Sequence, residues 1–255
     1  MFEFPLIRFD DRQWLIKLQN GEFFMRNSLY YQKIEAEDLA RSDPYDGSIP
    51  FPDTNSVMKE ITGKETKNER IVLLNRFIKC FYHCTDADFT YIGGNIWKLQ
   101  LSKEAMQEVS NFKVDSAMII FNPSAFINQV LKECNINSKR MWYGDVKYLD
   151  DKDYHQIIQT LEEEPSECYK IPFYKRMKFK NQKEFRFCIH HPFVHYDRES
   201  TWIDIPKEVV DKSYSLQIGA IEDSCVMNIN TLFHNGVLLD YQNEHYYVCE
   251  DEENA

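Results

Sequence analysis

The order of the strand-type and helix-type segments is the feature of this sequence that most constrains its fold. Runs rich in aromatic and β-branched residues, typical of β-strands, occur at 2–9, 78–84 and 183–189. Helix signals fall between such runs at irregular intervals; Asn122 and Pro123, for example, make an N-cap and first-turn pair. Since doubly wound parallel folds need a regular strand–helix alternation, the sequence predicts an α+β fold. We expect a mixed or mainly antiparallel sheet core with peripheral helices.

The same signals predict the remaining elements and the domain organisation. Further strands are expected at 22–25, 95–101, 117–121, 143–149, 201–205, 214–218 and 245–249. Ser102 is expected to begin a helix, and the segment 228–239 fits either a helix or a strand. Because no internal repeat and no Gly/Ser-rich linker marks a boundary, we predict a single domain over residues 1–255 with an acidic tail at about 250–255.

The charge of the chain limits the partners that it is expected to have. The formal net charge is −11, from 41 acidic and 30 basic residues. Phosphate backbones favour Lys/Arg-rich surfaces, so the composition argues against non-specific nucleic-acid binding and leaves nucleic acid open as a target of modification. The densest basic segment is 176–183, with four basic residues among eight. A solvated surface or a local anion-binding patch would both account for it.

Targeting signals and cysteine usage indicate a cytoplasmic protein without a membrane partner. No stretch reaches the ~18 apolar residues that a membrane helix needs. The N-terminus lacks the basic region and the small-residue cleavage site of a signal peptide. The seven cysteines are an odd number, and several lie inside apolar runs, where cysteine acts as a small hydrophobic residue. A reducing compartment fits this pattern, and the sequence gives no oligomeric state.

The run 183–189 is the most informative segment for function. In a strand, Phe185, Phe187 and Ile189 point to one face, whereas Glu184 and Arg186 point together to the other. One interpretation is an ion pair on a solvated face. The other is a catalytic Glu184 on a rigid strand at a cleft, oriented by Arg186. Such a carboxylate can accept a ribose hydroxyl, act as a base or stabilise a developing cation.

The loop at 41–56 is expected either to cover a pocket or to consist of ordinary turns. Residues 41–56 lack periodicity and are predicted to form a long loop, in which Asp43 and Pro44 favour a turn. If that loop covers a pocket, Tyr45 can stack on a planar ligand and Arg41 can bind a phosphate. A shorter polar loop is expected at 85–94, between two strands.

Three further residues near the N-terminus are candidates for ligand binding. Arg8 ends the first predicted strand, and Tyr30 and Tyr31 follow the second. A lone arginine at a strand end is also common on a plain protein surface, so both interpretations stay open.

Cysteine and histidine spacing gives no metal site. Cys80, His83 and Cys84 lie in a predicted strand, where positions 80 and 83 face opposite ways. Pro192 prevents the helix that would bring His191 and His195 to one face. We therefore expect no metal.

The order of motifs along the chain resembles that of an uncharacterised bacterial family, some members of which are linked to abortive infection and phage defence. The matching pieces are 14–25, 41–47, 80–81, 116–130, 146–148 and 173–186. The resemblance covers most of the chain from about residue 10 to residue 220.

The sequence is also distantly similar to ADP-ribosyltransferase-like toxins. Carried over by position, the resemblance implies that Arg8 grips NAD, that Tyr30 or Tyr31 lies near the nicotinamide, and that Glu184 is catalytic. Cleavage of the nicotinamide–ribose bond develops positive charge on the ribose, which a carboxylate stabilises. The resemblance thus implies an ADP-ribosyltransferase-like fold with NAD as substrate.

Three functions therefore remain open from the sequence. The first is an NAD-dependent ADP-ribosyltransferase or NAD-cleaving enzyme. The second is a non-catalytic sensor module that recognises a small-molecule ligand or a partner protein through Glu184, Arg186, Arg41 and Tyr45. The third is a metal-dependent nuclease that combines Asp43 or Asp46 with Glu184.

Overall fold

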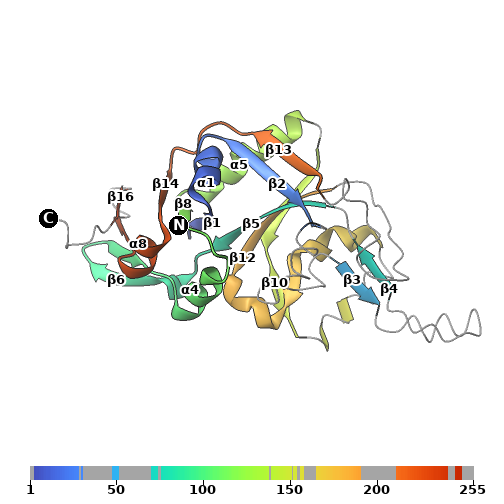
Figure 1. Ribbon diagram of the computed structural model, residues 1–255, viewed down its shortest axis with the longest axis horizontal. Helices are drawn as coiled ribbons and strands as arrows, with labels where there is room; N and C mark the ends of the chain where they lie inside the picture. The colour runs from blue at the N-terminus through green and yellow to red at the C-terminus, as the bar shows by residue number, and fades with distance from the viewer. Residues whose placement is uncertain are drawn as a thin grey trace, which may run out of the picture.

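The structure of the chain is a computed structural model that describes residues 3–28, 30, 48–51, 70–73, 76–137, 139–150, 152–153, 156–157, 165–190, 211–240 and 245–248. The expected strand 201–205 lies outside these residues. Figure 1 shows a central sheet, with helices on both of its faces and smaller sheets at its two ends.

The central sheet has eight strands, and every strand pair in it is antiparallel. Its strands are β1 (Leu6–Asp10), β2 (Glu22–Asn27), β5 (Arg76–His83), β8 (Ser116–Ile120), β9 (Met141–Asp145), β12 (Glu184–His190), β13 (Ser213–Gln217) and β14 (Ser224–Asn228). Their order is β13-β2-β5-β1-β8-β14, and β12 pairs with β5 and β9. Because the helices are not interleaved with parallel strands, the expected α+β class with an antiparallel sheet is confirmed.

Helices and small sheets surround this sheet. The helices are α1 (Arg12–Gln19), α4 (Lys103–Ser110), α5 (Pro123–Ile136) and α8 (Ile229–His234), with 3₁₀ segments η1 (Asp86–Asp88), η2 (Pro165–Phe173) and η3 (Met177–Gln182). A four-stranded sheet has the order β16 (His245–Val248), β15 (Val237–Asp240), β7 (Ile96–Leu99) and β6 (Phe89–Gly93). Two further strand pairs lie in the described part of the chain: β10 (Lys147–Leu149) with β11 (Tyr174–Arg176), and β3 (Ser48–Phe51) with β4 (Arg70–Leu73).

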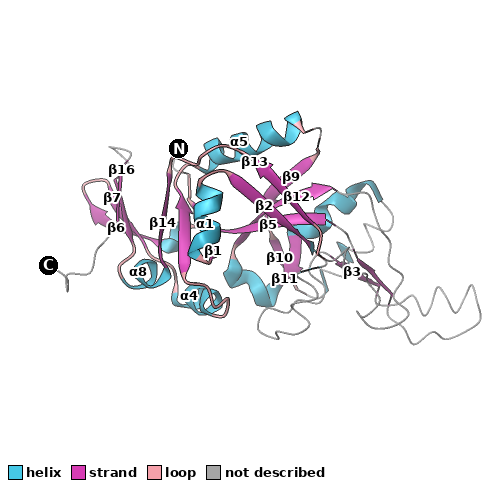
Figure 2. Ribbon diagram, turned by 45° about the horizontal axis from the view of Figure 1, so that its top comes forward, coloured by secondary structure: helices cyan, strands magenta, loops and turns pink. Residues whose placement is uncertain are grey.

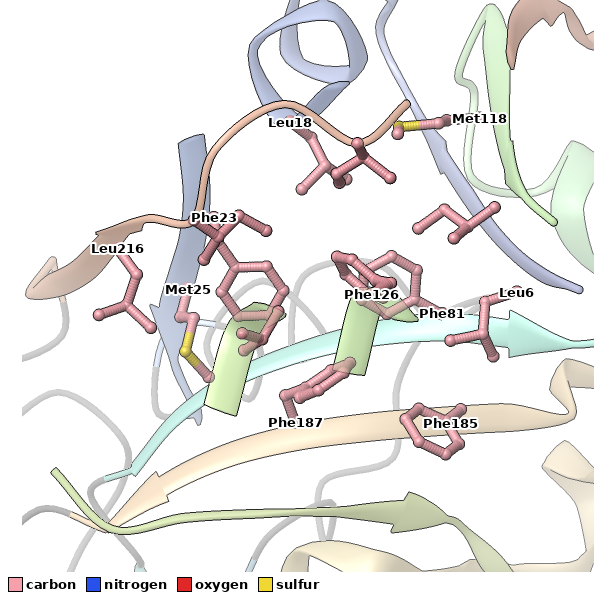
Figure 3. Packing of buried hydrophobic residues seen from close by; sticks show 14 of the residues in the cluster. Leu6, Leu18, Phe23, Met25, Phe81, Met118, Phe126, Phe185, Phe187 and Leu216 are labelled. Atoms are coloured by element: carbon pink, nitrogen blue, oxygen red, sulfur yellow. The ribbon is translucent and has the colours of Figure 1, made fainter. Parts of the chain in front are cut away.

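The two faces of the central sheet bury separate hydrophobic clusters. On one face, α1 and α5 cover an aromatic core in which Phe23, Phe81, Phe126 and Phe187 meet at centroid distances of 5.2–6.5 Å (Figure 3). On the other face, α4 and α8 pack over a second cluster (Figure 2). Edge-to-face ring contacts of this kind add to the free energy gained by burying the rings.

The predicted helix starts are confirmed. Asn122 accepts a hydrogen bond from the backbone N–H of Ala125 at 3.0 Å, and Pro123 occupies the first turn of α5. Ser102 caps α4 in the same way through the N–H of Ala105. Each side chain satisfies a backbone donor that the helix itself cannot pair.

The strand β5 is a fork in the central sheet. β1 pairs with it at His83 and Tyr82, and β2 pairs with the same edge at Ile78 and Phe77. Two side chains bridge the gap: Arg8 Nη1 donates to the carbonyl of Cys80 at 2.9 Å, and Lys79 Nζ donates to that of Phe24 at 3.2 Å. They supply contacts where no described strand pairs with this edge.

Several expected element bounds are wrong. The run 143–149 is not one strand, because β9 pairs with β12 while β10 pairs with β11 in a different sheet. The expected loop 85–94 contains η1 and all of β6, and the expected loop 41–56 contains β3. The segment 228–239, for which the sequence fitted either a helix or a strand, contains both a helix, α8, and a strand, β15.

Candidate functional site

A cavity of about 220 Å³ lies on the face of the sheet that α4 covers. It is lined by Ile7, Arg8, Phe9, Asp10, Ile78, Cys80, Phe81, Tyr82, Glu108, Val109, Phe112, Val114, Lys175, Gln182, Glu184 and Arg186. The register explains its floor, because Ile7, Tyr82 and Glu184 stand in one row across β1, β5 and β12. Arg186 is opposite Cys80 in the next row along the strands.

Glu184 is buried in this cavity between two cations. Its Oε1 accepts a hydrogen bond from Lys175 Nζ at 2.7 Å, and its Oε2 accepts one from Arg186 Nε at 2.6 Å. The exposed fractions are 9% for Glu184, 4% for Lys175 and 1% for Arg186. Burial alone would raise the pKa of Glu184, but the Arg186 and Lys175 charges outweigh it and hold the pKa well below its ordinary value. The carboxylate is therefore ionised.

Both cations also hold the surrounding segments in place. Lys175 Nζ donates to Gln182 Oε1 at 2.7 Å, which joins β11 to η3. Arg186 Nη1 donates to the carbonyl of Pro172 at 2.8 Å, at the end of η2. Arg76, buried on the same face, donates to the carbonyl of Tyr169 in η2 at 3.1 Å. Two buried arginines thus tie η2 to the sheet.

The backbone of Glu184 is fixed as firmly as its side chain. Its N–H donates to the hydroxyl of Tyr148 at 2.8 Å, and its carbonyl accepts from the N–H of Val146 at 2.8 Å. Burial, followed by the nearby Glu184 charge, raises the pKa of Tyr148, which keeps the hydroxyl protonated. Lys183, at the strand start, has a left-handed φ of 40°, so the strand begins one residue later than expected.

Much of the remaining cavity lining is apolar. Val109 is on α4, and Phe112 and Val114 follow that helix, while Ile7 and Phe9 come from β1. The cavity is therefore amphipathic: an ionic cluster forms one wall, and aliphatic and aromatic side chains form the other.

Arg8 borders the same cavity as Glu184, but its guanidinium has a structural role. Strand alternation and register place its side chain on the same face as Phe81, opposite to that of Glu184. Its Nη2 also donates to Asp10 Oδ2 at 2.7 Å.

The structure does not bring Tyr30 to the cavity. The guanidinium of Arg26 lies 4.1 Å from the centroid of the Tyr30 ring, and neither residue lines the cavity. The candidates Tyr31, Arg41, Asp43 and Tyr45 lie outside the described residues, as does Asp46 of the nuclease hypothesis.

Lys175 and Gln182 are site residues that the sequence did not single out. Lys175 belongs to the basic stretch around η3, which is a signal for an anion-binding patch, but its pairing with Glu184 depends on the three-residue strand β11. Short strands and 3₁₀ turns carry no periodicity, so the sequence does not show which side chains they bury.

Two further polar clusters involve Tyr82 and His83 of β5. Asp88 is buried and accepts hydrogen bonds from the hydroxyl of Tyr82 at 2.8 Å and from Lys183 Nζ at 2.9 Å. Nδ1 of His83 lies 2.6 Å from Asp145 Oδ1 at the ends of β5 and β9. Within the described ranges, no three His, Cys, Asp or Glu side chains gather as metal ligands would.

Fold and site together define an α+β protein with an amphipathic cavity on one face of an antiparallel sheet. Comparison of the chain with protein-family models, with curated proteins and with solved structures finds no significant match. No helix in the described part of the chain is long and apolar enough to cross a membrane.

Proposed function

We propose that this chain is a non-catalytic ligand-binding module that takes a small molecule into the cavity beside Glu184. The observation that carries the proposal is the buried Lys175–Glu184–Arg186 cluster, which forms the polar wall of an otherwise largely apolar cavity. A mostly apolar cavity with a few fixed polar groups is typical of small-molecule sites.

The state of Glu184 favours binding over catalysis. A carboxylate that acts as a base needs a pKa near the working pH, whereas the two neighbouring cations lower that of Glu184. A carboxylate that stabilises a developing cation needs a negative charge that is not already balanced, and here Lys175 and Arg186 balance it.

The size of the cavity supports a ligand of modest size. Its volume of about 220 Å³ is below the roughly 300–1,000 Å³ of pockets that hold drug-sized ligands. A dinucleotide is larger than this space, which favours a smaller molecule.

The proposal is tested by thermal unfolding of the full chain with 1-octanol, octylamine or octanoate, three compounds with the same alkyl chain and different head groups. A probe at 100 times its Kd adds about 2.7 kcal/mol to the free energy of unfolding. The expected rise in Tm is therefore roughly 5–10 °C.

A cavity-filling variant supplies the control for this experiment. Val109→Phe places a larger side chain on the apolar wall and is expected to abolish the rise in Tm. Ile136→Phe, at an exposed position of α5 away from the cavity, is expected to keep it. If no probe raises Tm, or if the rise survives in Val109→Phe, the chain does not bind small molecules in this cavity.

NAD cleavage is the second candidate, because Arg8 and Glu184 border the same cavity. It predicts release of nicotinamide when the protein is incubated with NAD, and loss of that release in Glu184→Gln under conditions in which circular dichroism shows that the variant is folded. Equal release by wild type and Glu184→Gln, or none by either, would exclude Glu184 as the catalytic residue for this reaction.

A further inference from the structure

We infer that the ligand is a neutral, largely apolar molecule, held by contacts with the apolar lining of the cavity and not by an ion pair with Lys175 or Arg186. This inference rests on the proposed function and specifies the class of ligand. It follows from the bonds that the polar lining groups already make within the chain.

The ionic wall of the cavity is bonded to other groups of the chain. Lys175 Nζ donates to Gln182 Oε1 and to Glu184 Oε1, both at 2.7 Å. Arg186 donates from Nε to Glu184 Oε2 at 2.6 Å and from Nη1 to the carbonyl of Pro172 at 2.8 Å. Each oxygen of Glu184 therefore already accepts from a cation. A charged head group at this wall would exchange existing charge-assisted hydrogen bonds for new ones of the same kind, so the net gain is small.

Two other polar lining side chains are engaged in the same way. The hydroxyl of Tyr82 donates to Asp88 Oδ1 at 2.8 Å. Arg8 donates to Asp10 Oδ2 at 2.7 Å and to the carbonyl of Cys80 at 2.9 Å. A ligand rich in hydrogen-bonding groups would have to break such bonds to make its own, whereas an apolar ligand leaves them intact.

The cavity lining carries charges of both signs. It contains three cationic and three acidic residues: Arg8, Lys175, Arg186, Asp10, Glu108 and Glu184. An ion of either sign would meet like charges as well as opposite ones. It would also lose its hydration on entering the cavity, a cost that a neutral molecule does not have. The charge pattern therefore favours a neutral ligand.

The apolar side chains supply the contact surface for such a ligand. Ile7 and Phe9 come from β1, Val109 from the last turn of α4, and Phe112 from the segment after that helix. The affinity then grows with the apolar area that the ligand removes from water, by roughly fourfold for each buried methylene. The chemistry that fits is a small aliphatic or aromatic alcohol, ketone or ester.

Titration calorimetry of the full chain at neutral pH tests this inference with the same three octyl compounds and with 1-hexanol. We expect 1-octanol to bind at least ~10-fold more tightly than octanoate or octylamine, because only the two ions lose the hydration of a charge. 1-Hexanol is two methylenes shorter and is expected to bind roughly 10-fold more weakly than 1-octanol.

A valine-to-threonine substitution tests the apolar contact with little change in the volume of the side chain. Val109→Thr places a hydroxyl group in the lining and is expected to weaken 1-octanol binding by at least ~4-fold, about the effect of one methylene. Val130→Thr, at a buried position of α5 outside the cavity lining, is the matched control and is expected to keep the affinity. Binding of 1-octanol to both variants also shows that they fold.

The outcomes separate the two proposals. If octanoate or octylamine binds the wild type as tightly as 1-octanol does, the neutral class is wrong and the binding function stands. If 1-hexanol binds as tightly as 1-octanol, or if Val109→Thr keeps the wild-type affinity, apolar contacts do not hold the ligand and the inference fails. If none of the four compounds binds the wild type, the proposed function fails and the inference fails with it.

Discussion

Glu184 and Lys79 are both buried charged residues of the central sheet, but their surroundings differ. Glu184 has two cations within hydrogen-bonding distance. Lys79 lies on the aromatic face, with its Nζ 5.5 Å from the ring centroid of Phe23 and 6.0 Å from that of Phe81. Burial, followed by the charge of Arg8, lowers the pKa of Lys79 to about 7.

The titration of Lys79 predicts how stability depends on pH. Its ordinary pKa is 10.5 and its pKa in the folded state is about 7, so between these values the unfolded chain binds one more proton at this residue. The free energy of unfolding therefore rises with pH in this window, by up to roughly 1.4 kcal/mol per pH unit from this group. In Lys79→Met this contribution is absent. Urea unfolding of both proteins at pH 7, 8 and 9 measures the difference, and parallel pH profiles would contradict the assignment.

Removal of the Glu184 charge is expected to destabilise the fold strongly. Glu184→Gln leaves Lys175 and Arg186 buried without their shared counter-charge, and breaking a buried ion pair costs about 3–5 kcal/mol. In the wild type, the low pKa of Glu184 gives stability that is present above its ordinary pKa of 4.5 and is lost as the pH falls below it. Denaturant unfolding measures the change at neutral pH. The double variant Glu184→Gln/Lys175→Met is expected to recover part of the loss, and a change below about 1 kcal/mol in Glu184→Gln is incompatible with a buried ion cluster.

At the scale of elements, two side chains cap the start of α5: Asn122, and Glu3, whose Oε2 accepts from the backbone N–H of Ser124 at 3.1 Å. Asn122→Ala removes the acceptor for the N–H of Ala125 and is expected to lower the free energy of unfolding by about 1 kcal/mol. Asn122→Ser keeps an acceptor and is expected to lose much less. Thermal unfolding of the two variants measures the difference, and equal losses would show that the cap does not stabilise α5.

The elements with a clear period were predictable from the sequence. The alternation in β12 correctly separates Phe185 and Phe187 from Glu184 and Arg186, since the first pair packs in the aromatic core and the second lines the cavity. The sequence could not predict whether the polar face of β12 contacts water or a cavity, because that depends on the positions of α4 and η3. The break at Val146 could not be predicted, because the chain there leaves one sheet for another and the partner of each short strand lies far from it in the sequence.

At the scale of the whole molecule, the central sheet separates the aromatic core from the candidate binding cavity. One face carries the aromatic core under α1 and α5, and the other carries the cavity under α4. Alternate residues of β12 contribute to both, so Phe187 packs in the core while Arg186 forms part of the cavity wall. The candidate ionic wall is thereby mounted on a strand whose other face packs in the aromatic core, as a preorganised binding site requires.

The unequal pairing at β5 determines which side of the cavity opens first by local unfolding. β5 and β12 are paired over seven residues, whereas β1 and β2 are each paired with β5 at two positions. Local opening begins where the fewest backbone hydrogen bonds must break. Amide hydrogens between β1 and β5 are therefore expected to exchange with solvent sooner than those between β5 and β12. Entry into the cavity by such breathing would move Ile7 and Phe9 aside while the wall formed by Glu184 and Arg186 keeps its position.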